Sequence, residues 1–109
     1  MNIHSTDVHS TCRIPVERVA EARSSFSACS LSFEVEFEAD GLVALSDLVL
    51  LINRSGLTCD HLKYCSPNRI MARLCDSRSA NLQLLDADLA TQVSIRLVRW
   101  TNVVSRRSS

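Results

Sequence analysis

Apolar and polar side chains begin to alternate at residue 30, and the pattern lasts for one short segment. Its apolar positions are Leu31, Phe33, Val35 and Phe37, and its polar positions are Ser32, Glu34, Glu36 and Glu38. A period of two puts successive side chains on opposite faces of a strand. The segment therefore predicts a strand with one dry face and one acidic face.

A helical pattern follows the Asp40-Gly41 pair, which breaks the strand. Its apolar positions are Leu42, Leu45, Leu48, Val49 and Ile52. This spacing predicts one helix of about four turns with a single apolar stripe. Gly56 stands where a left-handed residue would end that helix.

Two further strands are predicted on either side of the turn Ser66-Pro67-Asn68. In the first, the core side holds either Leu57, Cys59 and His61 or Leu62 and Tyr64, and periodicity leaves both assignments open. In the second, Ile70, Ala72 and Leu74 alternate with Met71, Arg73 and Cys75. The short turn predicts that these two strands are antiparallel.

The last part of the pattern predicts a second helix and a fourth strand. Ser77 and Ser79 are candidate N-caps, and Leu82, Leu85 and Leu89 would form the buried stripe of the helix. Val93, Ile95 and Leu97 then alternate with Ser94, Arg96 and Val98, and the strand is expected to end near Trp100.

The order over residues 30–100 is β-α-β-β-α-β, which is typical of a ferredoxin-like α+β sandwich. Right-handed crossovers predict a four-stranded antiparallel sheet in the order 4-1-3-2 with two helices on one face. The row Glu34, Glu36 and Glu38 would then lie between Arg73 and Arg96 on neighbouring strands, where opposite charges stabilise a sheet. The predicted strand residues of the core are Leu31, Phe33, Val35, Phe37, Ile70, Ala72, Leu74, Val93, Ile95 and Leu97.

The two ends of the chain read differently from this middle part. Residues 1–29 are rich in Ser, Thr and His and are interpreted as a polar leader or arm, in which a short helix can begin after Pro15. Residues 101–109 are interpreted as a polar tail. A chain of 109 residues fits one domain.

Composition narrows the classes of function. The 12 basic and 12 acidic side chains cancel, so we expect no nucleic-acid partner. No apolar run is long enough for a membrane span and no secretory signal is present, so a cytoplasmic protein without a membrane partner is expected. The five cysteines are widely spaced and are interpreted as reduced thiols.

The run from Phe33 to Thr58 resembles the opening half of an ACT domain. The shared features are a strand that ends in a glycine turn, a leucine-rich helix, and a Gly-Leu pair that begins the next strand. Gly41 and Gly56, the only two glycines, fall at the glycine positions of that family. The resemblance implies a regulatory module that senses a small amino acid or pairs with an enzyme subunit, with ligand contacts at Asp40, Gly41, Leu42 and Val43. Independently, a glycine turn before a helix permits close backbone approach and offers free N–H groups to a carboxylate, although Gly41 could equally serve the turn alone.

A free-standing ACT domain of this length is similar to the small regulatory subunits of acetohydroxyacid synthase, which implies a homodimer or a heteromer with a catalytic subunit. The alternative is a small interaction or inhibitor protein, for example phage-borne, with the same fold and no small-molecule ligand. No motif of a catalytic site is present, so we expect no enzyme activity and no cofactor. The sets His4, His9, Cys12 and Cys59, His61, Cys65 lack tight zinc spacing, so no metal site is predicted.

Overall fold

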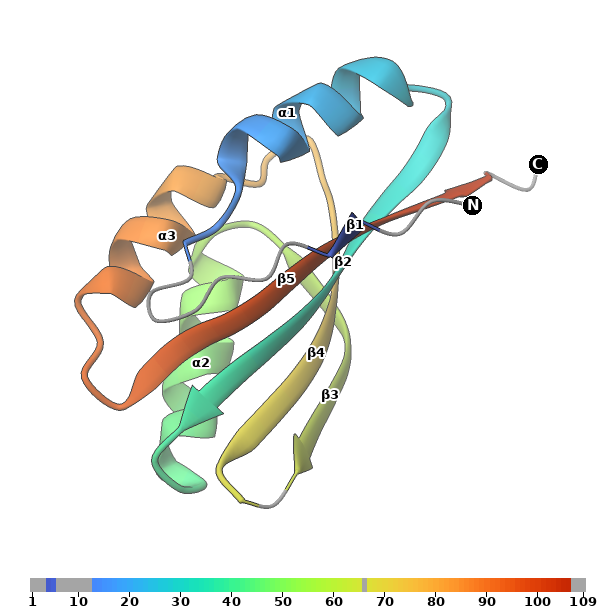
Figure 1. Cartoon of the computed structure of the whole chain (residues 1–109). Coiled ribbons are helices and arrows are strands. Elements are labelled where there is room, and N and C mark those ends of the chain that lie inside the picture. The colour runs from blue at the N-terminus through green and yellow to red at the C-terminus, as the bar shows by residue number, and fades with distance from the viewer. Residues whose placement is uncertain (1–3, 6–12, 66, 107–109) are drawn as a thin grey trace.

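The computed structural model describes residues 4–5, 13–65 and 67–106. Within them the chain is an α+β protein with a five-stranded antiparallel sheet and three helices (Figure 1). The elements are β1 (His4–Ser5), α1 (Val16–Ser25), β2 (Cys29–Ala39), α2 (Val43–Arg54), β3 (Thr58–Cys65), β4 (Arg69–Cys75), α3 (Leu82–Ala90) and β5 (Ile95–Arg106). The sheet order is β1-β5-β2-β4-β3, so β2 lies between the two strands that carry its arginine partners.

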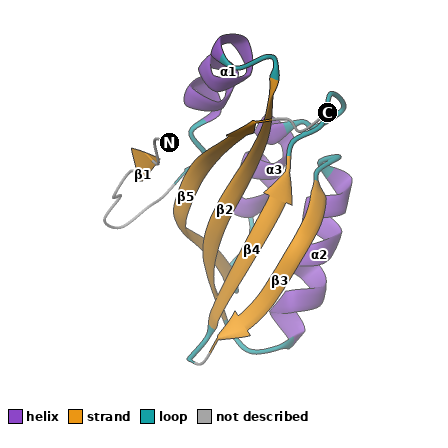
Figure 2. Cartoon of the chain, turned by 90° about the vertical axis from the view of Figure 1, so that its right-hand side faces the viewer, coloured by secondary structure: helices purple, strands orange, loops and turns teal. Residues whose placement is uncertain are grey.

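Helices α2 and α3 cover the same face of the sheet (Figure 2). The core between these layers includes the fully buried Phe33, Leu48, Ile70 and Leu85. The buried stripe of α2 consists of Ala44, Leu48, Leu51 and Ile52. The prediction was wrong for Leu42, which stands at the N-cap and is 63% exposed.

The expected boundaries of β5 were wrong at both ends. Val93 is 99% exposed and precedes the strand, which continues to Arg106 through most of the predicted tail. Within the strand there is also a register shift, because Leu97 lies opposite Phe37 while Arg99 lies opposite Glu36. Such a bulge moves the core-facing positions by one residue, and simple alternation therefore fails beyond Leu97.

The bulge brings Trp100 into the core, where it is 3% exposed. Its ring lies 4.8 Å from that of Phe33, measured between centroids. Its indole N–H donates to Asn102 Oδ1 at 2.9 Å. The residue expected to close the domain is thus part of its interior.

The segment 13–25, predicted to belong to an arm, packs onto the domain. Helix α1 begins after Pro15, as expected, and Val19 from this helix is fully buried together with nearby Ile14. At the other side, β1 pairs with β5 through His4 opposite Asn102. The predicted sandwich of four strands and two helices therefore lacked one strand and one helix.

A second bulge decides the facing of β3. Cys59 lies opposite Leu74 on the core side, whereas His61 lies opposite Arg73 on the open side. Leu62 and Tyr64 return to the core side, so each assignment left open by periodicity was right for part of the strand. The expectation that Cys59 and His61 share a face was wrong, because the register shifts between them.

The ends of the helices are fixed by particular residues. Gly56 follows α2 with φ of 87°, as its predicted capping position requires. The N-cap of α3 is Asn81 rather than Ser77 or Ser79, since the Asn81 side chain accepts the Leu84 N–H at 3.1 Å. The stripe of Leu82, Leu85 and Leu89 is confirmed as buried. Among the described residues, none of the helices has the length and apolar character needed to cross a bilayer.

Candidate functional site

The turn from β2 into α2 holds the four predicted ligand positions, Asp40, Gly41, Leu42 and Val43. Gly41 has φ of 82°, and the Asp40 N–H is held by Ser94 O at 2.9 Å. The turn is open, because a Cβ built at Gly41 would meet nothing within 4 Å and Val43 is 81% exposed. A ligand could approach this backbone closely, but the turn alone provides no walls around it.

The exposed face of α2 continues from this turn and consists of Val43, Asp47, Leu50 and Arg54. We call it the α2 face. All four side chains are exposed, Leu50 by 64%. Among the described residues, the ion pair of Arg54 is a long one, at 3.7 Å to Asp88. Two apolar and two oppositely charged side chains therefore alternate in solvent along one side of a helix whose other side is buried.

The open face of the sheet carries a ladder of ion pairs. Its pairs are Glu34 with Arg73 at 3.2 Å, Glu36 with Arg69 at 2.6 Å and with Arg99 at 3.3 Å, and Glu38 with Arg96. The predicted partners Arg73 and Arg96 are confirmed, and Arg69 and Arg99 are additional. Each glutamate thus has a basic partner, so the row is not a free acidic surface.

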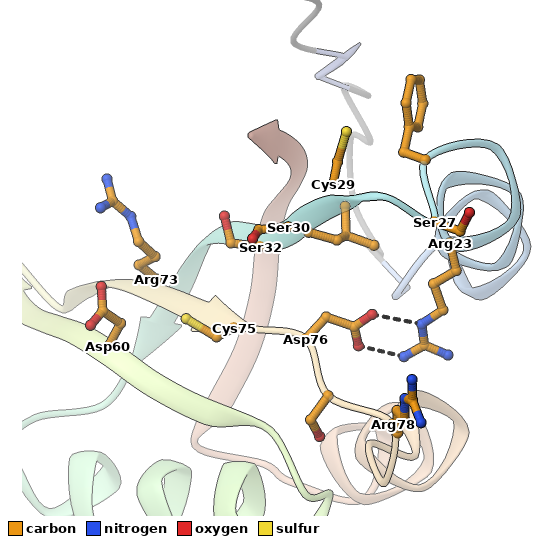
Figure 3. A pocket seen from close by; sticks show the side chains of 13 residues that line it. Arg23, Ser27, Cys29, Ser30, Ser32, Asp60, Arg73, Cys75, Asp76 and Arg78 are labelled. Atoms are coloured by element: carbon orange, nitrogen blue, oxygen red, sulfur yellow. Dashed lines mark hydrogen bonds and ion pairs between the residues drawn. The ribbon is translucent and has the colours of Figure 1, made fainter. Parts of the chain in front are cut away.

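A groove of about 770 Å³ lies at the other end of β2, near the end of α1 and of β4 (Figure 3). Its charged lining consists of Arg23, Arg73, Arg78, Asp60 and Asp76. Arg23 donates from Nε and Nη2 to the two carboxylate oxygens of Asp76, at 2.8 and 2.6 Å. These hydrogen bonds raise the pKa of Arg23 above its ordinary value, although partial burial opposes them. Sequence reasoning missed the groove because its residues come from three separate stretches of the chain.

A smaller hollow of about 400 Å³ lies between α3 and the start of β5. Asp86 at its rim accepts hydrogen bonds from Arg13 Nη2 at 2.6 Å and from the Ile14 N–H at 3.1 Å. Burial raises the pKa of Asp86, but these bonds outweigh it, and the pKa is lower than that of an ordinary aspartate. The hollow is closed on one side by this ion pair.

The thiols and imidazoles do not converge in the described part of the chain. Cys29, Cys59, Cys65 and Cys75 are free, and burial raises the pKa of Cys59 above its ordinary value. Cys59 and His61 face opposite sides of the sheet. No group of three or more possible metal ligands occurs among the described residues, and His9 and Cys12 lie outside them.

The resemblance to ACT domains rests on the order of the elements and on the two glycines. Both glycines have positive φ, as tight turns require. Neither feature identifies a ligand or a partner. Compared with family models, with curated proteins and with solved structures, the chain has no match.

Proposed function

We propose that the chain is a non-catalytic regulatory or binding module, resembling an ACT domain, that pairs with a second copy of itself through the α2 face. The observation that carries the proposal is the exposure of Val43 and Leu50, by 81% and 64%, on one side of an otherwise well-packed helix. Covering two aliphatic side chains on association is favourable by roughly 25 cal/mol for each Å² removed from water. A partner surface is the simplest means of covering them.

The charges beside Leu50 fit a second copy of the same helix. Asp47 lies three residues before Leu50 and Arg54 lies four residues after it. If two α2 helices pack antiparallel about a twofold axis beside Leu50, Asp47 of each copy faces Arg54 of the partner subunit. A twofold interface must be self-complementary in this way. The α2 face therefore carries both halves of such an interface.

The order of the strands in the sheet supports the ferredoxin-like fold that the sequence predicts. Numbered along the chain from β2 to β5, the four long strands lie in the order 2-3-1-4 from the β3 edge. Listed from the β5 side instead, the same order of strands is 4-1-3-2. The additional β1 and α1 would then be attachments to a β-α-β-β-α-β unit.

A small amino acid would bind at the turn once the pair has formed. Asp40, Gly41, Leu42 and Val43 lie at the start of the α2 face, where the chain that follows the partner's α2 helix would approach the open turn and supply the wall that it lacks. The free N–H groups at the start of α2 would receive the ligand carboxylate. Valine, leucine and isoleucine are the ligands to test first, because the resemblance includes regulatory subunits of branched-chain amino-acid synthesis.

The second candidate is a small interaction or inhibitor protein without a small-molecule ligand. It is favoured by one observation, the open space around Gly41. Thermal shifts with the twenty amino acids distinguish the two candidates. A rise in melting temperature with an aliphatic amino acid, lost in a variant that cannot pair, supports the sensor, whereas no response favours the protein binder.

Sedimentation velocity of the full chain tests the pairing itself. We expect a dimer at about 100 µM, and a monomer for Leu50→Glu because a carboxylate would be buried at the centre of the interface. Val93→Glu is the matched control, since Val93 is 99% exposed and lies outside α2. A monomeric wild type, or a Leu50→Glu variant that pairs as well as the control, would overturn the proposed interface.

A further inference from the structure

The groove at the end of β2 has more basic than acidic side chains in its wall. Three arginines and two aspartates line it. One of the aspartates, Asp76, is already held by Arg23 through two hydrogen bonds, and its side chain is only 13% exposed. The other charges of the wall are more open to solvent. Arg73 is paired with Glu34 on the sheet face, so Arg78 is the arginine of this wall that has no acidic partner among the described residues.

Two donors in this wall remain available for a ligand. Arg78 is exposed, and no ion pair joins it to an acidic group within the described chain. Arg23 uses Nε and Nη2 for Asp76, and none of its hydrogen bonds in that same part of the chain involves Nη1. Figure 3 shows Arg23, Arg78 and Asp76 in the wall of the groove. Arg23 and Arg78 both line this groove, and guanidinium donors that are not used within the chain favour an anionic ligand.

The rest of the wall suits an organic molecule rather than a bare ion. The hydroxyls of Ser27, Ser30 and Ser32 add hydrogen-bonding groups, and Phe26 and Leu31 add apolar surface. The volume of about 770 Å³ is within the range of roughly 300–1,000 Å³ typical of small-molecule sites. We propose that this groove binds a small organic anion, whose carboxylate or phosphate group lies between Arg23 and Arg78.

This site is independent of the α2 face, because it lies at the opposite end of β2 and shares no residue with that face. The anion would contact α1, β2 and the segment after β4 together. It would therefore hold α1 more firmly against the sheet. Binding should raise the melting temperature in the Leu50→Glu variant as it does in the wild type.

Isothermal titration of the full chain at low ionic strength tests the proposal with three probes, inorganic phosphate, pyrophosphate and citrate. We expect at least one probe to bind with one site per chain and a Kd below about 10 mM. A preference for pyrophosphate identifies a phosphate ligand, and a preference for citrate identifies a carboxylate ligand. Absence of saturable binding by all three probes would overturn the proposal.

Two variants locate the binding. Arg78→Gln should weaken the preferred probe by about tenfold or more, because it removes a charged donor from the site. Arg99→Gln is the matched control, since it removes another exposed arginine, from the sheet face, and leaves Glu36 paired with Arg69. Its affinity should stay within about twofold of the wild type. An equal loss in both variants would show a general charge effect and contradict the groove.

Discussion

Gly41 and Gly56 show how far a sequence pattern can define a single residue. Both were predicted to be turn positions, and both have positive φ, of 82° and 87°. Their surroundings differ in a way that no local pattern reveals. A Cβ at Gly41 would lie in open space, whereas one at Gly56 would lie 2.7 Å from Ser79 O. The close approach arises only when α3 and its preceding loop pack against the end of α2.

Alanine substitutions should separate these two effects. Gly41→Ala should cost about 1–2 kcal/mol, from the left-handed backbone alone. Gly56→Ala should cost about 1–3 kcal/mol more, because the backbone of Ser79 must also move. Urea unfolding of the two variants measures the difference in the free energy of unfolding. Equal losses would show that the contact at Gly56 is not tight.

Elements with regular alternation were predictable, and elements with bulges were not. In β2, the pattern predicted both the buried Phe33 and Phe37 and the outward glutamates. In β5, the pattern failed after Leu97, because a bulge there arises from the way β5 pairs with β2. The sequence of one strand alone does not show where such a bulge lies. The facing of β3 remained open for the same reason.

The ion-pair ladder predicts unequal roles for its glutamates. The side chain of Glu36 is 15% exposed and contacts both Arg69 and Arg99. That of Glu34 is 52% exposed and, among the described residues, is paired only with Arg73. Glu36→Gln should therefore cost about 1–3 kcal/mol, and Glu34→Gln less than about 1 kcal/mol. Chemical denaturation of both variants checks this order, and a larger loss for Glu34→Gln would contradict it.

At the scale of the whole molecule, the sequence did not predict that residues 13–25 pack onto the domain. Helix α1 is mostly polar, and Val19 is its only residue buried below the surface. Its attachment depends on Arg13 with Asp86 and Arg23 with Asp76, pairs that are 73 and 53 residues apart. Contacts over such separations leave no periodic signal. The groove left no signal for the same reason, because its residues come from separate stretches of the chain.

The attachment near Arg13 should weaken in acid. Because the pKa of Asp86 is lower in the folded chain than its ordinary value, this carboxylate stabilises the fold fully above about pH 4. That contribution is lost as the pH falls through the lowered pKa. Wild type should therefore be more stable than Asp86→Asn at neutral pH, and the difference should shrink in acid. Urea unfolding at neutral pH and near pH 3 measures it. A difference independent of pH would contradict this role.

The central claim is that two copies pair through antiparallel α2 helices, and charge reversal with rescue tests it most directly. The measurement is the sedimentation coefficient of Asp47→Arg, Arg54→Asp and the double variant, each at the concentration where the wild type is a dimer. Each single variant places like charges opposite one another in both copies and should sediment as a monomer. The double variant restores opposite charges and should sediment as a dimer. Dimeric single variants, or a monomeric double variant that is folded, would contradict the account.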